Sequence, residues 1–438
     1  MSLKGIGCLF IAVSSLFCSY QTVCAQKHLT EIQRDSTIKS HHIIYFGEGN
    51  QPSRDSVESQ IQQFYVDQFR HFSDPLAPYF LFMSRDTQLA MGIGGCVRMR
   101  GWYDWGGAIP ANGFSPYLIP MTKNPLRERA LGTTPAGTTL FYRVIGRNKT
   151  LGQYQLYIEA NFNGYSSRDF QLKKAYAVLN DVTIGYANST FSDPAALPPT
   201  VDASGPNCKM SATSVLVRWM HNFKKGFTIA ASVETPDTHI TPVAGQTAAV
   251  TDYVPDIAAF TQYAWGANNH LRLAGIMRFI PYRNLLKEQN HNVAGGGLQL
   301  SGVVHAATQW TFYGCINGGK GFESLGGDWL IGNYDLIADP TKPGVMKTPW
   351  GYGGYAAIQY NFRPNLFASA TFGGAVYRPG KMAEPTEYDN GMYIAANVYW
   401  NITARIQVAA EFNLGRRENF DTSKMWARRA GLMAQFSF

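Results

Sequence analysis

The sequence is poor in charge and in cysteine, and each shortage excludes a class of protein. Asp, Glu, Lys and Arg make up 16% of the 438 residues, against about 25% in ordinary soluble domains. A coiled coil would need many more Glu, Lys and Leu residues. Only Cys96, Cys208 and Cys315 follow residue 25. Because they are odd in number, far apart and in no Cys-x-x-Cys pair, we expect neither a disulfide framework nor a zinc site.

Long apolar runs are also missing beyond the N-terminus. A bundle of membrane-spanning helices would need runs of about 18 apolar residues, and none is present. Hydrophobic residues at 45%, aromatics at 13% and 43 glycines exclude a disordered chain, which is poor in apolar residues. Two architectures remain: a large secreted β domain and an outer-membrane β-barrel.

The N-terminus has the pattern of an export signal. Lys4 precedes an apolar run from Ile6 to Phe17, and Val23-Cys24-Ala25 resembles a cleavage site. We therefore expect residues 1–25 to be a signal peptide and the mature chain to begin near Gln26.

Residues 26–88 should form a periplasmic tail followed by one amphipathic helix over residues 53–72. The apolar positions recur at helical spacing and end before Asp74-Pro75; they are Val57, Ile61, Phe64, Tyr65, Phe69 and Phe72. Three roles stay open for this helix: it could dock on the barrel, plug it, or pair with copies of itself.

From Leu89 to the C-terminus the apolar period changes to two, which predicts strands. One example alternates apolar residues at 154, 156, 158, 160 and 162 with mostly polar ones between them. Such strands of about 9–11 residues suit a tilted crossing of a bilayer. We expect an all-β fold for residues 89–438, a transmembrane β-barrel of sixteen antiparallel strands. The predicted strands are 89–103, 138–147, 152–162, 170–179, 182–189, 211–221, 227–234, 256–265, 270–280, 292–306, 309–317, 353–361, 366–377, 389–400, 404–415 and 428–438.

The connections alternate between tight turns and longer loops. This asymmetry is typical of outer-membrane barrels, whose periplasmic turns are short and whose external loops are long, and it puts both chain ends on the periplasmic side. The last strand ends in an aromatic residue, Phe438, on the same face as Leu432 and Phe436. That ending places an aromatic side chain at the lower membrane interface.

Enzyme motifs are absent or incomplete. Gly314, Gly319 and Lys320 have the spacing of a phosphate-binding loop, but Gly321 replaces the Ser or Thr that would hold magnesium. We predict no catalytic residue, no metal, no cofactor and no nucleic-acid partner. Partners should be small solutes and outer-membrane lipid.

The functional residues should then be those that face the lumen. A lipid-facing Arg at the bilayer midplane costs about 2–4 kcal/mol, so strand arginines are assigned inward. The predicted inward cations are Arg98, Arg100, Arg143, Arg147, Lys173, Arg218, Arg272, Arg278, Arg405 and Arg429. Inward acids are fewer: Glu159, Glu234 and Glu411. A narrow wet pore with this wall should favour anions, although some of these arginines could instead brace the wall by pairing with acids.

The loop at 190–210 is the predicted constriction. Its first part, residues 190–206, holds four prolines and neither Lys nor Arg. A sixteen-strand barrel is wide enough for an aqueous channel, so an inward-folded third loop would narrow it. Asp193 and Asp202 would then face the basic wall. The other interpretation is an exposed proline-rich surface loop.

Three blocks resemble the DcaP-like outer-membrane porins, a trimeric family. They are Phe170–Tyr176 with Thr183–Tyr186, Ser189–Pro194 continuing to Pro206, and Tyr79–Phe82 with Leu89–Gly95. The resemblance implies a homotrimer that passes small anions such as dicarboxylates. Some members carry an N-terminal periplasmic coiled coil, in place of which this chain has one short helix. Lys173 and Lys174 also stand where the family often has Arg.

The sequence therefore favours an anion-selective porin, a passive channel for small hydrophilic solutes such as carboxylates. The alternative is an outer-membrane binding or adhesion barrel that displays the long loops 104–137 and 318–352 without significant transport.

Overall fold

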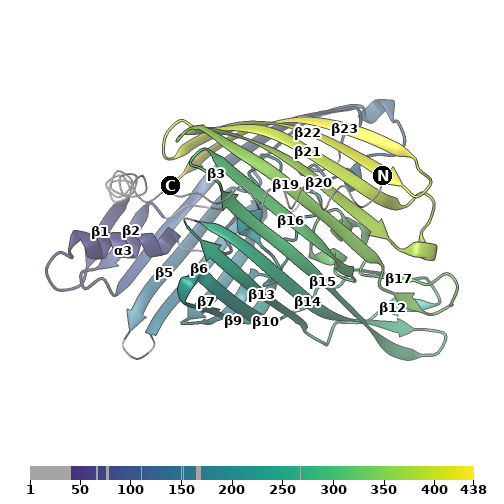
Figure 1. Cartoon of the computed structure of the whole chain (residues 1–438), viewed down its shortest axis with the longest axis horizontal. Helices are drawn as coiled ribbons and strands as arrows, with labels where there is room; N and C mark the ends of the chain where they lie inside the picture. Colours follow the sequence, from purple (N-terminus) through teal and green to yellow (C-terminus); the bar gives the residue numbers. More distant parts are fainter. Residues whose placement is uncertain are drawn as a thin grey trace.

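The computed structural model describes residues 41–438 apart from 66–67, 75–77, 110, 149, 151, 164–168 and 267. The expected signal peptide lies outside the described residues. Sixteen antiparallel strands form a closed barrel, and the final strand pairs with the first, Phe436 opposite Val97 (Figure 1). The barrel strands are β3 (Leu89–Trp105), β5 (Thr139–Asn148), β6 (Gly152–Asn163), β7 (Asp169–Leu179), β8 (Val182–Asn188), β9 (Thr213–Asn222), β10 (Phe227–Glu234), β13 (Asp256–Trp265), β14 (Asn269–Asn284), β15 (Gln289–His305), β16 (Trp310–Lys320), β19 (Trp350–Arg363), β20 (Leu366–Arg378), β21 (Tyr388–Asn401), β22 (Ile406–Asn419) and β23 (Lys424–Ser437). The predicted fold class and strand number are confirmed.

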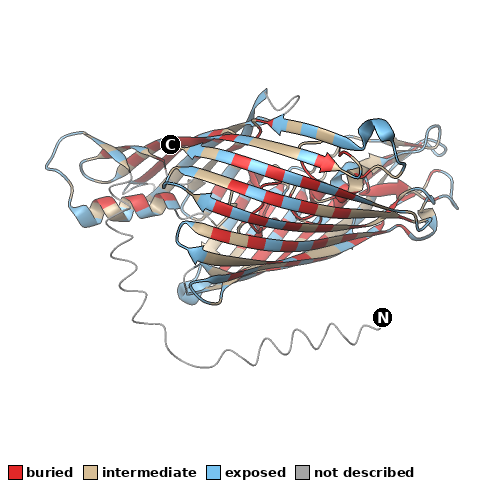
Figure 2. Cartoon of the chain, turned by 90° about the horizontal axis from the view of Figure 1, so that it is seen from above, coloured by how far each residue is buried: buried red, intermediate tan, exposed pale blue. Residues whose placement is uncertain are grey.

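The period of two in the sequence appears as two faces of each strand. Leu156 and Ile158 are exposed on the outside of β6, whereas Tyr157 and Glu159 are buried inside. Buried and exposed residues alternate in this way along most strands (Figure 2). Exposed aromatics gather at both ends of the outer surface, where lipid head groups meet water. Those beside the short turns include Trp265, Trp310 and Trp400, and those near the long loops include Tyr103, Trp350 and Trp426. The exterior therefore fits a bilayer.

Short elements extend the barrel at its external end. β4 (Arg129–Thr134) continues the pairing of β3, and β12 (Thr247–Ala249) continues that of β14. A separate small sheet and most of the helical elements lie in the long loops, and the 3-10 turn Lys224–Gly226 lies in the short turn between β9 and β10. These elements are β11 (Ile240–Thr241), β17 (Leu336–Ala338), β18 (Met346–Lys347), α4 (Trp329–Gly332), and the 3-10 turns Pro116–Leu118, Pro125–Arg127, Pro194–Ala196, Lys224–Gly226, Glu323–Leu325 and Gly380–Met382. No helix in the described part of the chain is both long and apolar enough to cross a membrane.

The residues before the barrel form a small α/β module at its periplasmic end, at the left of Figure 1. β1 (His42–Phe46) pairs in parallel with β2 (Phe80–Ser84), and β2 pairs antiparallel with the first residues of β3. α3 (Arg54–Tyr65) packs Val57, Ile61 and Phe64 into one apolar cluster with side chains of β2, β3 and β5. The module is thus joined to the barrel both by backbone pairing and by a shared core.

Two expectations about this region were wrong. The segment 26–50 was expected to be a tail, but its last part contains β1. The helix was expected to reach residue 72, but α3 ends at Tyr65. Phe69 and Phe72 continue the helical stripe by spacing alone, since their rings pack inside the barrel against Phe260 and Phe367.

The largest core lies within the barrel rather than between sheets. Phe191 and Cys208 from the third loop meet Phe322 and Trp329 from the sixth loop, together with Phe69. The external half of the lumen is therefore filled with loop side chains. A functional site in the lumen can occupy only the space that these segments leave open.

Candidate functional site: the barrel interior

The third loop, residues 189–212 between β8 and β9, folds into the lumen. Nearly all of residues 189–202 are buried. Its backbone is held by the far wall: the amides of Val201 and Asp202 each donate to the Glu411 carboxylate at 2.8 Å, and the Pro199 carbonyl accepts from Ser369 and Asn397. The third loop therefore lies inside the barrel, which is the position expected for residues 190–210.

The start of the third loop is fixed by acids on both sides. The Thr190 amide donates to Glu234 at 2.8 Å. Asp193 accepts from Ser301 at 2.6 Å and lies 2.9 Å from His270 Nε2. Burial disfavours the charge of Asp193, but Arg272 and His270 hold its pKa below the usual range.

A second segment enters the lumen from the periplasmic end. Residues 68–74, which we call the luminal segment, follow α3 and lie against the barrel wall at several strands. Arg272 Nη2 on β14 donates to the Gln68 carbonyl at 3.4 Å, and Asn188 on β8 donates to the Phe69 carbonyl at 2.9 Å. Arg98 on β3 donates to the Ser73 carbonyl at 2.7 Å. The contacts come from distant strands, so the segment crosses the lumen.

Two aromatic side chains anchor this segment. The Arg218 guanidinium lies 3.9 Å from the centre of the Phe69 ring, a cation–π geometry. Phe72 packs edge-on against Phe367 and Tyr399, with ring centres 5.7 and 5.2 Å apart. Phe69 and Phe72 therefore reach opposite parts of the wall.

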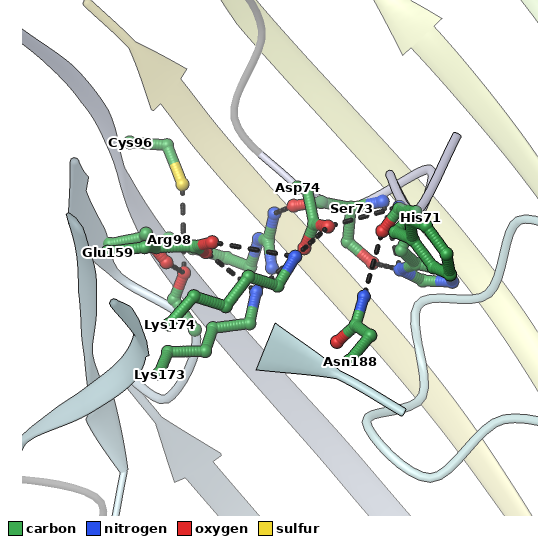
Figure 3. A network of polar contacts seen from close by, with 12 residues as sticks. His71, Ser73, Asp74, Cys96, Arg98, Glu159, Lys173, Lys174 and Asn188 are labelled. Atoms are coloured by element: carbon green, nitrogen blue, oxygen red, sulfur yellow. Dashed lines mark hydrogen bonds and ion pairs between the residues drawn. The ribbon is translucent and has the colours of Figure 1, made fainter. Parts of the chain in front are cut away.

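The segment ends at Asp74, which two consecutive lysines bind (Figure 3). Lys173 Nζ lies 2.7 Å from Asp74 and 2.7 Å from Glu159, while Lys174 Nζ lies 3.0 Å from Asp74. Burial opposes the charge of Asp74, yet Lys173 and Lys174 hold its pKa well below the usual range. Asp74 is therefore an ionised group inside the barrel.

Below the third loop the lumen contains a cavity of about 880 Å³. It is bounded by the luminal segment, by residues 195–200 of the third loop and by the periplasmic turns near 266–269 and 401–407. Among the described lining residues, Asp74 is the one acid, whereas four arginines line it: Arg70, Arg98, Arg100 and Arg405. His71, His270 and His305 also contribute. This wall is strongly basic.

Arg98 and Arg100 form a guanidinium pair in this wall. Both Nη1 groups approach Gly137: a Cβ there would lie 2.9 Å from Arg98 Nη1 and 3.6 Å from Arg100 Nη1. Arg98 bonds to Gln435 and Arg100 to the Ala136 carbonyl. Within the described residues neither has a carboxylate within 4.0 Å. Two like charges held together with no carboxylate in direct contact are suited to binding an anion.

Most of the other predicted cations are buried against other parts of the chain, whereas Arg147 is exposed. Arg143 donates to the Phe64 carbonyl at 2.7 Å. Arg272 donates to the Ser192 carbonyl, and Arg278 pairs with Asp256 and Asp335 at 3.0 and 3.2 Å. Arg429 is paired with Asp104 at 2.6 Å, and the Arg405 guanidinium lies over the Tyr79 ring at 3.6 Å. A basic wall along the whole lumen is thus corrected to a basic cavity, and the contact of these residues with solute stays a prediction.

Asp193 faces the basic wall at β14, where its carboxylate lies 3.6 Å from Arg272 and 2.9 Å from His270. Asp202 instead accepts from the amides of Phe114 in the first loop and Gly205 in its own loop, at 2.6 and 2.7 Å. Burial raises the pKa of Asp202. Both acids hold loops in place.

Sequence reasoning missed Lys174 and the luminal segment. The pleat should turn consecutive lysines to opposite faces. In the structure the β6–β7 register shifts after the pair Glu159–Lys174, because Ala160 pairs with Leu172 and Lys173 is the extra residue. This bulge turns both lysines inward, and no residue type in the sequence marks it.

The described residues include no group of three or more His, Cys, Asp or Glu side chains placed to hold a metal. Cys96, Cys208 and Cys315 are buried and unpaired. No protein-family model and no curated protein sequence matches the chain.

Solved structures do match its fold. The outer membrane channel DcaP of Acinetobacter baumannii aligns with a TM-score of 0.68 at 16% identity, covering 82% of this chain and 99% of that one. The chain has the fold of an outer-membrane porin. An anion-selective porin from Comamonas acidovorans aligns with a TM-score of 0.55 at 9% identity, over 80% of this chain and 100% of that one. The trimer form of OmpT from Vibrio cholerae gives 0.52 at 10% identity, over 80% and 99%. The predicted resemblance to DcaP-like porins is confirmed for the fold.

Proposed function

We propose that this barrel is a passive outer-membrane channel for small hydrophilic solutes, with a preference for anions such as small carboxylates. The basic cavity carries the proposal: four arginines and one acid border about 880 Å³ of space. Two unit charges 4 Å apart interact by about 4 kcal/mol at an effective dielectric constant near 20, so this cavity should concentrate anions. No bond is made or broken in this function.

The alternative, a barrel that displays loops, has less support. Phe114 in the first loop and Trp329 in the sixth loop are fully buried. Each loop thus packs a large aromatic side chain inside the lumen, whereas Leu126 and Leu131 of the first loop are exposed. A homotrimer remains part of the proposal, supported by the family resemblance and by the trimer form of one structural neighbour. Native mass measurement in mild detergent tests it, and a monomer would remove this part alone.

The test of anion preference is the reversal potential of the reconstituted protein under a KCl gradient. We expect the wild type to prefer chloride. Arg98→Ser with Arg100→Ser should lower the anion-to-cation permeability ratio, because it removes the guanidinium pair from the cavity wall.

The matched control removes the same charge elsewhere. Arg127 and Arg129 are exposed in the first loop, and replacing both with Ser should leave the ratio unchanged. A wild type that prefers cations would contradict the proposal, and an unchanged ratio in the Arg98/Arg100 variant would remove these two residues from the selective region.

A further inference from the structure

We propose that Lys173 and Lys174 form a carboxylate-binding site in the lumen, which the chain fills with its own Asp74, so that the luminal segment is a tethered plug. Small carboxylate anions compete with Asp74 for this site and release the plug. The inference rests on the proposed channel function and adds its regulation.

The position of the segment makes it an obstacle. Arg98 and the lysine pair hold one end, and Phe72 reaches Phe367 on β20. Arg272 on β14 holds the other end. Residues 68–74 therefore lie across the lumen next to the basic cavity, which six of the seven residues border, all but Phe69.

The bulge in β7 places the two lysine side chains of the site on the same face of the strand. A regular strand would turn one of two consecutive lysines toward lipid. The extra residue Lys173 brings both ammonium groups to Asp74 (Figure 3). Bulges of this kind re-aim side chains at functional sites. Lys173 alone already pairs with Glu159 at 2.7 Å, and Lys174 lies closer to the luminal carboxylate Asp74, at 3.0 Å, than to Glu159, at 3.7 Å.

The charge count shows which ligand fits. Lys173 and Lys174 are balanced by Glu159 and Asp74. Burial lowers the pKa of His71, next to Asp74, to about 3, so its imidazole is neutral. When Asp74 leaves, the two lysines lose the carboxylate that bridges them, and a small carboxylate supplies both the charge and the acceptor oxygens that the lysines lose.

Release of the plug leaves α3 in place. α3 is held by its own apolar cluster on β2, β3 and β5, which does not include the luminal segment. The segment itself is held mainly through backbone carbonyls, Asp74 and two rings. Loss of the Asp74 contact therefore removes both ion pairs of the plug with the wall that involve Lys173 and Lys174.

The variant Asp74→Asn tests the plug. It keeps the shape and removes the charge, and breaking a buried ion pair through one partner should raise the open fraction by about tenfold or more. The measurement is the mean single-channel conductance in a planar bilayer. Asp55→Asn makes the same change in the first turn of α3, outside the lumen, and should leave conductance at the wild-type value.

Trypsin cleavage measures release of the plug independently of conductance. The Arg70–His71 bond lies inside the barrel, where a protease cannot enter, so it should resist cleavage in the wild type and in Asp55→Asn. In Asp74→Asn, mass analysis should detect cleavage after Arg70. Unchanged conductance in Asp74→Asn would overturn the plug, whether or not this bond is cleaved.

Succinate tests the competition. Added to the wild type at constant ionic strength, it should raise mean conductance, and it should have no such effect on Asp74→Asn. Equal responses of the two proteins, or none in either, would overturn the carboxylate site. The plug is tested by conductance and the anion preference by the reversal potential of the wild type, so the two proposals stand or fail separately; a chain that conducts in neither form overturns both proposals.

Discussion

At the scale of single residues, the cations inside this barrel have different roles: some pair with acids of the fold, and others border the open cavity. Arg278 is fully buried between Asp256 on β13 and Asp335 in the sixth loop, and these two carboxylates neutralise its charge. Arg98 and Arg100 border the cavity without a carboxylate partner among the described residues. The same residue type on the same face of the wall thus braces the fold at one height and offers charge to solute at another.

Gly137 is predicted to determine where the guanidinium pair lies. Its φ of 88° is strained for other residues, and a Cβ would meet Arg98 Nη1 at 2.9 Å. Gly137→Ala should lower stability by about 1 kcal/mol and also reduce anion preference, because the Arg98 side chain must shift. Gly245→Ala is the control, since φ there is 73° with nothing within 4 Å: it should cost similar stability and leave reversal potentials unchanged. Equal reversal potentials in both variants would contradict the role of Gly137.

Asp328 predicts a pH dependence of loop packing. It accepts from Ser115 at 2.5 Å, Asn207 at 3.0 Å and Tyr388 at 2.9 Å, which joins the first, third and sixth loops to the wall. Burial raises its pKa to about 6 from 3.8. The folded state therefore holds a proton that the unfolded state has lost between these values, and stability falls as pH rises through this window and then levels off.

The measurement is the melting temperature at about pH 4.5 and about pH 7.5. Asp328 contributes at most roughly 3 kcal/mol in favour of the acidic condition. Asp328→Asn removes this titration, so its melting temperature should gain less on acidification than that of the wild type. The same gain in both proteins would show that Asp328 does not titrate in this range.

At the scale of elements, the strands were predictable and the inserted segments were only partly so. Strands alternate because one face meets lipid and the other meets the lumen, and this leaves a period of two that the sequence displays directly. The end of α3 could not be predicted, since Phe69 and Phe72 have helical spacing although they pack on Phe260 and Phe367. The bulge at Lys173 depends on register with β6, which is a tertiary property. β1 was missed because a five-residue strand is stabilised by its partner β2 rather than by its own pattern.

At the scale of the whole molecule, the site was predicted in kind but not in extent. Ten inward cations suggested a basic wall over the full height of the barrel. In the structure, three of the ten, Arg98, Arg100 and Arg405, border the cavity between the third loop, the luminal segment and the periplasmic turns. Loops and lumen share one interior, so four other cations, Lys173, Arg272, Arg278 and Arg429, pair with acids that are distant in sequence, and composition alone cannot show this.

This localisation predicts how selectivity depends on salt. Anion preference that arises from fixed charges around an open cavity weakens as ions screen them, and the screening length falls from about 10 Å at 0.1 M to about 3 Å at 1 M. The anion-to-cation permeability ratio should therefore fall toward one between these KCl concentrations in reversal-potential measurements. Because the Arg98/Arg100 double Ser variant has lost part of the field, its ratio should start lower and change less. A ratio that is independent of salt in the wild type would mean that anions are selected by direct contact within a screened site, and the field of the basic cavity would then not be the source of the preference.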